Sequence, residues 1–164
     1  FADAAARLRE RINDAHMAAG VMILDSTTTW IEPFVTIAPD AIIEPGVALS
    51  GVTTIGARSR IGSHSSIIES SIGTDCVITA SMVEGSTLHD AVDVGPYAHV
   101  RPGCEIESRV HIGNFAELKS ARVQAGRKLR LRISRQRGNR RLRKSEAMRW
   151  LAFFLTAFHP TLSN

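Results

Sequence analysis

Two cations in the middle of the chain have the chemistry to bind one phosphate group. Arg101 and Lys119 stand eighteen residues apart. Arginine presents a planar fork of N–H donors and lysine a compact positive charge, and both stay charged at any working pH. The alternative is that Arg101 is a solvated charge at a corner and Lys119 a surface cation. The elements that hold the two residues decide between these interpretations.

A six-residue repeat runs through this part of the chain. An aliphatic residue, mostly isoleucine, recurs at every sixth position. In the first run, from Ile37 onward, a small or β-branched residue stands two positions before each of these aliphatic residues. This period is neither that of a helix nor that of an alternating strand. It predicts a β-helix in which each hexad forms one short strand and one turn. The two runs are Ile31, Ile37, Ile43, Leu49, Ile55, Ile61 and Ile67, then Val94, Val100, Ile106, Ile112 and Leu118.

The repeat predicts how the two cations are placed. Three hexads make one coil of about 18 residues, so residues 30–119 build about five coils. Residues eighteen apart then lie on one face of adjacent coils, and Arg101 and Lys119 should stack where they can clasp one phosphate. The register of the pattern slips by a residue around Ile72, Ile78, Val83 and Leu88, which predicts a bulged coil or a small loop.

The segment before the repeat predicts a helix over residues 2–17. It is rich in good helix formers, and Gly20 is a plausible stop. A helix already under way at residue 2 suggests that the chain begins in mid-protein. An apolar stripe at helical spacing should face the rest of the chain; it consists of Ala5, Leu8, Ile12 and Ala15.

The charge of the chain divides sharply near residue 120. Residues 1–120 carry 8 Lys and Arg against 15 Asp and Glu, whereas residues 121–164 carry 12 against one. The formal net charge of +4 therefore comes from the tail. Such a tail could bind nucleic acid, or lie on a membrane through the apolar residues 147–158. We expect neither partner, and we predict an irregular or helical basic segment without hexads.

Composition places the chain in a reducing compartment. Cys76 and Cys104 are too few for a disulfide scaffold and are expected to be buried thiols. No apolar run is long enough to span a membrane, and no signal peptide is recognisable. Aromatic residues make up only 5% of the sequence, which suits a narrow aliphatic solenoid interior. We expect a cytoplasmic protein.

Residues 1–119 resemble the bifunctional N-acetylglucosamine-1-phosphate uridyltransferase/glucosamine-1-phosphate acetyltransferase family (GlmU-type). The resemblance covers the linker helix and the first part of the hexapeptide-repeat acetyltransferase domain. The motifs that carry it are Arg11-Ile12-Asn13, His16-Met17, Gly20-Val21 and Leu24-Asp25, then Val94-Gly95-Pro96-Tyr97-Ala98, Arg101-Pro102-Gly103 and Gly113-Asn114-Phe115-Ala116-Glu117-Leu118-Lys119.

The resemblance implies a fold, a reaction and a site. The fold is an all-β solenoid, a left-handed parallel β-helix of hexapeptide repeats, in a homotrimer with active sites between subunits. The family moves acetyl from acetyl-CoA to the amine of glucosamine-1-phosphate, which supplies UDP-N-acetylglucosamine for peptidoglycan and lipopolysaccharide. Arg101 and Lys119 match the positions that bind the sugar phosphate. The uridyltransferase domain, which uses Mg²⁺, is not represented, so no metal site is predicted here.

The catalytic base of the family is missing from this sequence. Amine acetylation needs a base, and the family's histidine and a nearby tyrosine correspond to Leu131 and Ser134. The positions that hold acetyl-CoA are missing too, so no catalytic or cofactor-binding residue is predicted. The solenoid histidines are expected to be surface or corner residues; they are His64, His89, His99 and His111. The chain should be an inactive fragment; alternatives are a non-catalytic trimeric scaffold or a related hexapeptide sugar acyltransferase.

The predicted organisation has three parts: a linker helix over 1–20, the truncated β-helix over 21–119 and a tail over 120–164 that does not match the family. A shifted reading frame would explain the tail. If the codon of Arg132 ends in C and residues 133–135 are encoded by ATC-TCG-CGN, the frame beginning at that C reads His-Leu-Ala. This tripeptide resembles the missing catalytic stretch, offset by about one residue. The coding DNA tests this hypothesis, because hexads must resume in the shifted frame.

Overall fold

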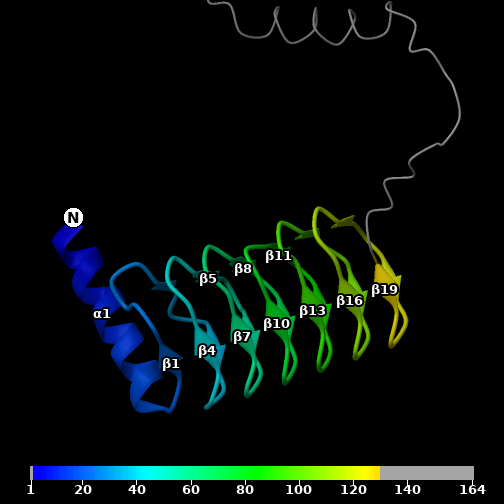
Figure 1. Ribbon diagram of the computed structural model, residues 1–164. Coiled ribbons are helices and arrows are strands. Elements are labelled where there is room, and N and C mark those ends of the chain that lie inside the picture. The colour runs from blue at the N-terminus through cyan, green and yellow to red at the C-terminus, as the bar shows by residue number, and fades with distance from the viewer. Residues whose placement is uncertain (1, 130–164) are drawn as a thin grey trace, which may run out of the picture. The chain divides into compact units, whose positions relative to one another are not determined.

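The protein is a solenoid of very short strands that follows one helix (Figure 1). The structure is a computed structural model that describes residues 2–129. The predictions for Leu131, Ser134 and the rest of the basic tail lie outside the described residues. Helix α1 (Ala2–Ala18) stands at one end of the solenoid, and nineteen strands follow it. This is the predicted β-helix with an N-terminal helix, and it fits the left-handed form.

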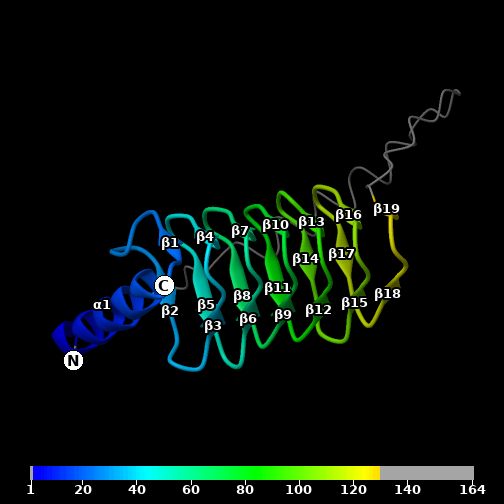
Figure 2. The same cartoon turned by 90° about the horizontal axis from the view of Figure 1, so that it is seen from below.

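The strands form three parallel sheets, one on each side of the solenoid (Figure 2). Sheet A contains β1 (Met22–Ile23), β4 (Ile42–Ile43), β7 (Arg60–Ile61), β10 (Val77–Ile78), β13 (Asp93–Val94), β16 (His111–Ile112) and β19 (Lys128–Leu129). Sheet B contains β2 (Trp30–Ile31), β5 (Ala48–Ser50), β8 (Ser66–Ile68), β11 (Met82–Glu84), β14 (His99–Val100) and β17 (Glu117–Leu118). Sheet C contains β3 (Thr36–Ile37), β6 (Thr54–Ile55), β9 (Ser71–Ile72), β12 (Thr87–Leu88), β15 (Glu105–Ile106) and β18 (Arg122–Val123). Each strand pairs with the strand one turn later, and the whole makes about six turns.

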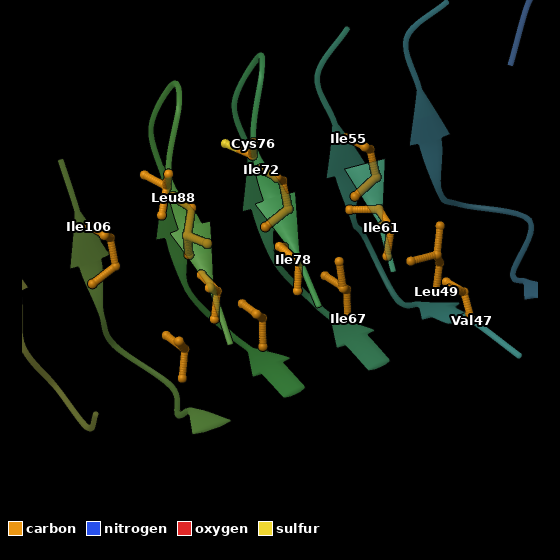
Figure 3. Close-up of a cluster of buried hydrophobic side chains, with 14 of the residues drawn as sticks. Val47, Leu49, Ile55, Ile61, Ile67, Ile72, Cys76, Ile78, Leu88 and Ile106 are labelled. Atoms are coloured by element: carbon orange, nitrogen blue, oxygen red, sulfur yellow. The ribbon is translucent and has the colours of Figure 1, made fainter. Parts of the chain in front are cut away.

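The repeated aliphatic residues stack inside the solenoid (Figure 3). Ile43, Ile61 and Ile78 are completely buried. The small residue two positions earlier is also buried and often carries a hydroxyl group. The Ser59 hydroxyl donates to Gly73 O at 2.8 Å and accepts from Cys76 N at 2.9 Å. The period therefore marks both an apolar stack and a row of polar groups that hydrogen-bond to the next coil.

The displaced members of the pattern do not form the predicted bulge or loop. Ile67 pairs with Val83 and Ile72 with Leu88, sixteen residues apart in both cases. The coils between residues 67 and 94 are shorter, and their ladder residues stay buried. Shortened corners take up the missing residues, so the sheets continue through this region in register.

Strands also continue past the predicted boundary at residue 119. β18 pairs with β15 and β19 with β16, which extends the described solenoid to Leu129. Val123 follows Leu118 by five residues and is buried, and Leu129 follows it by six. A search for strict hexads stops at Leu118 because this five-residue step breaks the period.

Helix α1 contacts the first coil through a polar face as well as an apolar one. Ile12 packs against the core, but Leu8 is 45% exposed. Only part of the predicted apolar stripe of the helix therefore faces the solenoid. Asn13 is fully buried and its amide donates to Ser26 O and Thr29 O at 3.0 and 3.1 Å. The Arg9 guanidinium lies 4.8 Å from the ring centre of Trp30. Among residues 2–129, no helix is long and apolar enough to cross a membrane.

Both cysteines are buried free thiols, as predicted. The Cys76 thiol donates to His89 O at 3.0 Å. Burial raises the pKa of the Cys76 thiol, which keeps it in the protonated form. Cys76 packs as a small apolar residue in the row that precedes the aliphatic ladder by two positions.

Replacing one ladder residue tests how much the stack contributes. Ile78→Ala should lower the free energy of unfolding by about 2–5 kcal/mol, because neighbouring coils cannot close the cavity. Urea unfolding followed by circular dichroism measures this loss. Val52 is 70% exposed, and Val52→Ala should change stability by less than about 0.5 kcal/mol. Similar losses in both variants would contradict the assignment of the core.

Candidate functional site

Arg101 and Lys119 occupy equivalent positions on adjacent coils. β14 pairs with β17, with His99 opposite Glu117 and Val100 opposite Leu118. Arg101 N donates to Leu118 O at 2.8 Å, which continues the ladder by one step. The next residues in register are the two cations, as the eighteen-residue spacing predicts. Figure 2 shows the two strands side by side in the part of sheet B far from α1.

A sharp corner follows each cation. Gly103, two residues after Arg101, has a φ of 82°, which favours glycine, and its N–H donates to Gly85 O at 3.0 Å. A Cβ at Gly103 would lie 3.3 Å from the Ser120 hydroxyl oxygen of the next coil. Ser120, directly after Lys119, also has a positive φ, of 46°. The two side chains thus stand at the end of the sheet B face, where the backbone turns away.

Two carboxylates lie on the same face as the two cations, and one of them pairs with Arg101. Arg101 Nη1 lies 3.1 Å from Glu117 Oε1, and the two side chains are 40% and 62% exposed. Glu84 precedes Arg101 by one coil, and its Oε2 lies 2.8 Å from His99 Nε2. Among the ion pairs of residues 2–129, none includes Lys119. An exposed ion pair contributes only about 0.2–1 kcal/mol, so a doubly charged phosphate can displace Glu117 from Arg101.

Three of the solenoid histidines lie near carboxylates of neighbouring coils, on three different sheets. His111 Nδ1 lies 2.6 Å from Asp93 Oδ2 on sheet A. His89 Nε2 lies 3.7 Å from Glu105 Oε1 beside sheet C. His99, paired with Glu84, belongs to the same face as Arg101. Within residues 2–129, no group of three or more His, Cys, Asp or Glu side chains could hold a metal ion.

Two aromatic rings stack on the corner between sheets A and B. The ring centres of Tyr97 and Phe115 are 5.6 Å apart with an interplanar angle of 18°. Both rings are largely exposed. Sequence reasoning named them only as motif residues, although they too stand eighteen residues apart. The spacing that links Arg101 to Lys119 would have found this second pair.

Removing the guanidinium group tests whether this pair binds phosphate. Arg101→Ala should weaken the binding of inorganic phosphate at least about tenfold, because a hydrogen bond to a charged group contributes about 1.5–3 kcal/mol. Amide chemical shifts of residues 99–101 and 117–119 during a phosphate titration give the affinity. Glu117→Gln should strengthen binding by about two- to fivefold, because it removes the competing anion.

Arg109→Ala is the matched control for this titration. Arg109 lies at the corner between sheets C and A, on another part of the surface. The substitution removes the same charge and should leave the phosphate affinity almost unchanged. If Arg101→Ala and Arg109→Ala weaken binding equally, phosphate responds to the net charge and not to the pair.

The sequence is similar to a part of several known proteins. No family model matches it. The Bifunctional protein GlmU of Enterococcus faecalis is 44% identical over 122 residues, which are 74% of this chain and 27% of that protein. The Bifunctional protein GlmU of Streptococcus equi subsp. zooepidemicus is 46% identical over 128 residues, 78% of this chain and 28% of that protein. The chain spans about a quarter of the length of these relatives.

A solved structure shares the fold. PerB from Caulobacter crescentus, in complex with CoA and GDP-perosamine, has a TM-score of 0.52 at 19% identity and covers 77% of this chain and 61% of its own. At this identity the likeness supports the β-helix alone. The identity to the GlmU proteins is much higher, at 44% over 122 residues and 46% over 128 residues. The chain therefore corresponds, over about three quarters of its length, to one part of the bifunctional GlmU proteins.

Proposed function

We propose that this chain is part of an acetyl-CoA-dependent glucosamine-1-phosphate N-acetyltransferase of UDP-N-acetylglucosamine synthesis, and that it has little or no activity by itself. The sugar phosphate binds to Arg101 and Lys119. One observation carries this proposal: Val100 pairs with Leu118, so the two cations follow in register on one face. Charge-assisted hydrogen bonds from a guanidinium and an ammonium group are well suited to a phosphate dianion.

The missing base is the reason for the proposed inactivity. The ammonium group of the acceptor must lose a proton before it can attack the acetyl carbonyl. The family positions for this step hold Leu131, which cannot accept a proton, and Ser134, a weak base. A shifted reading frame in the tail would account for both this loss and the arginine-rich composition. The nucleotide sequence between codons 119 and 145 tests that origin.

The cosubstrate and assembly follow from the same relationship. Acetyl-CoA is the acyl donor of the family, and PerB is a hexapeptide-type structure with CoA bound. A homotrimer would complete sites between subunits, and the buried free thiols suit the cytoplasm. No Mg²⁺ is expected, because the metal belongs to uridyl transfer, and neither nucleic acid nor a membrane is an expected partner.

Two alternatives compete with this proposal. A non-catalytic trimeric scaffold would use the solenoid only for its shape and would not bind glucosamine-1-phosphate at Arg101 and Lys119. A related hexapeptide sugar acyltransferase would use a different amino sugar. The binding titration addresses the first alternative, and an activity assay with several amino sugars addresses the second.

A thiol-release assay tests the proposed activity. With acetyl-CoA and glucosamine-1-phosphate, this chain should release no CoA thiol above the background rate, because no base accepts the proton. The GlmU protein of Enterococcus faecalis serves as the positive control under the same conditions. Clear turnover by this chain would overturn the proposed inactivity. Turnover only with another amino sugar would favour the related acyltransferase.

A further inference from the structure

The carbonyl groups that precede the strands of sheet B form a column along the solenoid. Each accepts a hydrogen bond from a backbone N–H of the preceding coil: Trp30 N donates to Val47 O at 2.9 Å, and Ala48 N donates to Ser65 O at 3.0 Å. The later acceptors of the column are Ser81 O, Ala98 O and Ala116 O. Thr29 O holds the equivalent position in the first coil, and helix α1 stands beside that coil, on the side away from the second coil (Figure 2).

A side chain of α1 supplies the donor for this first carbonyl. The side-chain amide of Asn13 donates to Thr29 O at 3.1 Å and to Ser26 O at 3.0 Å. These two acceptors fix the orientation of the amide, because a flipped amide would turn its oxygen toward them. The Asn13 oxygen has no hydrogen-bond partner among residues 2–129, so the two donors explain why this polar side chain is fully buried. The Asn13 amide thus takes the place of a backbone N–H of a preceding coil.

Other contacts of α1 hold Asn13 against the first coil. The helix packs on β1 and β2, and Ile12 lies against the core. One turn before Asn13, the Arg9 guanidinium lies over the ring of Trp30, the first residue of β2. Helix α1 therefore covers the edge of β2 with one apolar contact, one cation–π contact and two hydrogen bonds to backbone carbonyls.

An uncovered strand edge can pair with another chain, because its free N–H and C=O groups are ready to accept a further strand. A solenoid has this problem at its terminal coils, which need a cap for solubility. Two copies of this chain with uncovered first coils would present identical edges. Identical edges can pair across a twofold axis in an isologous contact, which closes after two copies.

We infer that Asn13 is the residue with which α1 closes the edge of the first coil, and that loss of its two donors opens this edge to a second copy of the chain. The latent surface is the edge of β2 together with the carbonyls of Ser26 and Thr29. Its partner is the same edge of the second copy. This cap and the phosphate pair are separate features, because β14 and β17 lie in the part of sheet B far from α1 (Figure 2).

Asn13→Asp in the full chain tests the cap. The substitution keeps the size of the side chain, but it replaces both donors with a buried carboxylate that the two carbonyls repel, so α1 should leave the edge. Sedimentation velocity should then show a species of about twice the mass of the unmodified protein, increasing with protein concentration. Arg11→Gln is the matched control, because Arg11 is exposed on α1 and its loss changes the net charge by the same amount. This control should keep the mass of the unmodified protein.

Disulfide cross-linking locates the contact between the two copies. Thr27 is exposed in the loop before β2, and Thr79 is exposed in the middle of the solenoid. In the Asn13→Asp background, an added Thr27→Cys should form an intermolecular disulfide, whereas Thr79→Cys should not. The native thiols, Cys76 and Cys104, are buried and do not compete.

Two results would overturn the cap. One is an unchanged mass for Asn13→Asp while circular dichroism shows that the solenoid is folded. The other is cross-linking through Thr79→Cys as readily as through Thr27→Cys, which would place the contact away from the first coil. If Asn13→Asp does not fold, Asn13→Ala decides, because it removes both donors without adding a charge and should shift the mass in the same direction.

Discussion

Each coil is held in place by backbone hydrogen bonds to the coils before and after it. The strands are two or three residues long, and every pair joins residues one turn apart. A strand of this length has no stability of its own, so order depends on stacking coils of similar cross-section. The aliphatic ladder and the inward hydroxyl groups serve this requirement together. The aliphatic side chains fill the interior, and the hydroxyl groups form hydrogen bonds with backbone groups near the corners.

The candidate site follows directly from this stacking. Because β14 and β17 must be in register, any two residues at equivalent positions become neighbours on the surface. Arg101 and Lys119 are one such pair, and Tyr97 and Phe115 are another. Evolution of a binding face on this fold therefore needs few substitutions, since the backbone already fixes where the side chains meet.

The fold and the placement of the cations could be predicted because both depend on the period. The ladder residues, the buried thiols and the stacking of Arg101 on Lys119 all follow from spacing. Glu117 beside Arg101 and Glu84 beside His99 could not be predicted, because these diagonal contacts depend on side-chain conformations. The burial of Asn13 could not be predicted for another reason. An asparagine in a helix is expected at the surface unless the backbone acceptors of its side-chain amide are known.

Because some corners are shortened, the number of residues between two stacked positions varies along the solenoid. Residues sixteen, seventeen or eighteen apart all occupy equivalent positions in different parts of the solenoid. A corner can thus lose a residue without turning any side chain from the outside to the inside, whereas an ordinary strand that slips by one residue reverses its faces. The architecture tolerates small length changes between its strands and keeps each surface column intact. A binding face can persist while the number of residues per turn drifts.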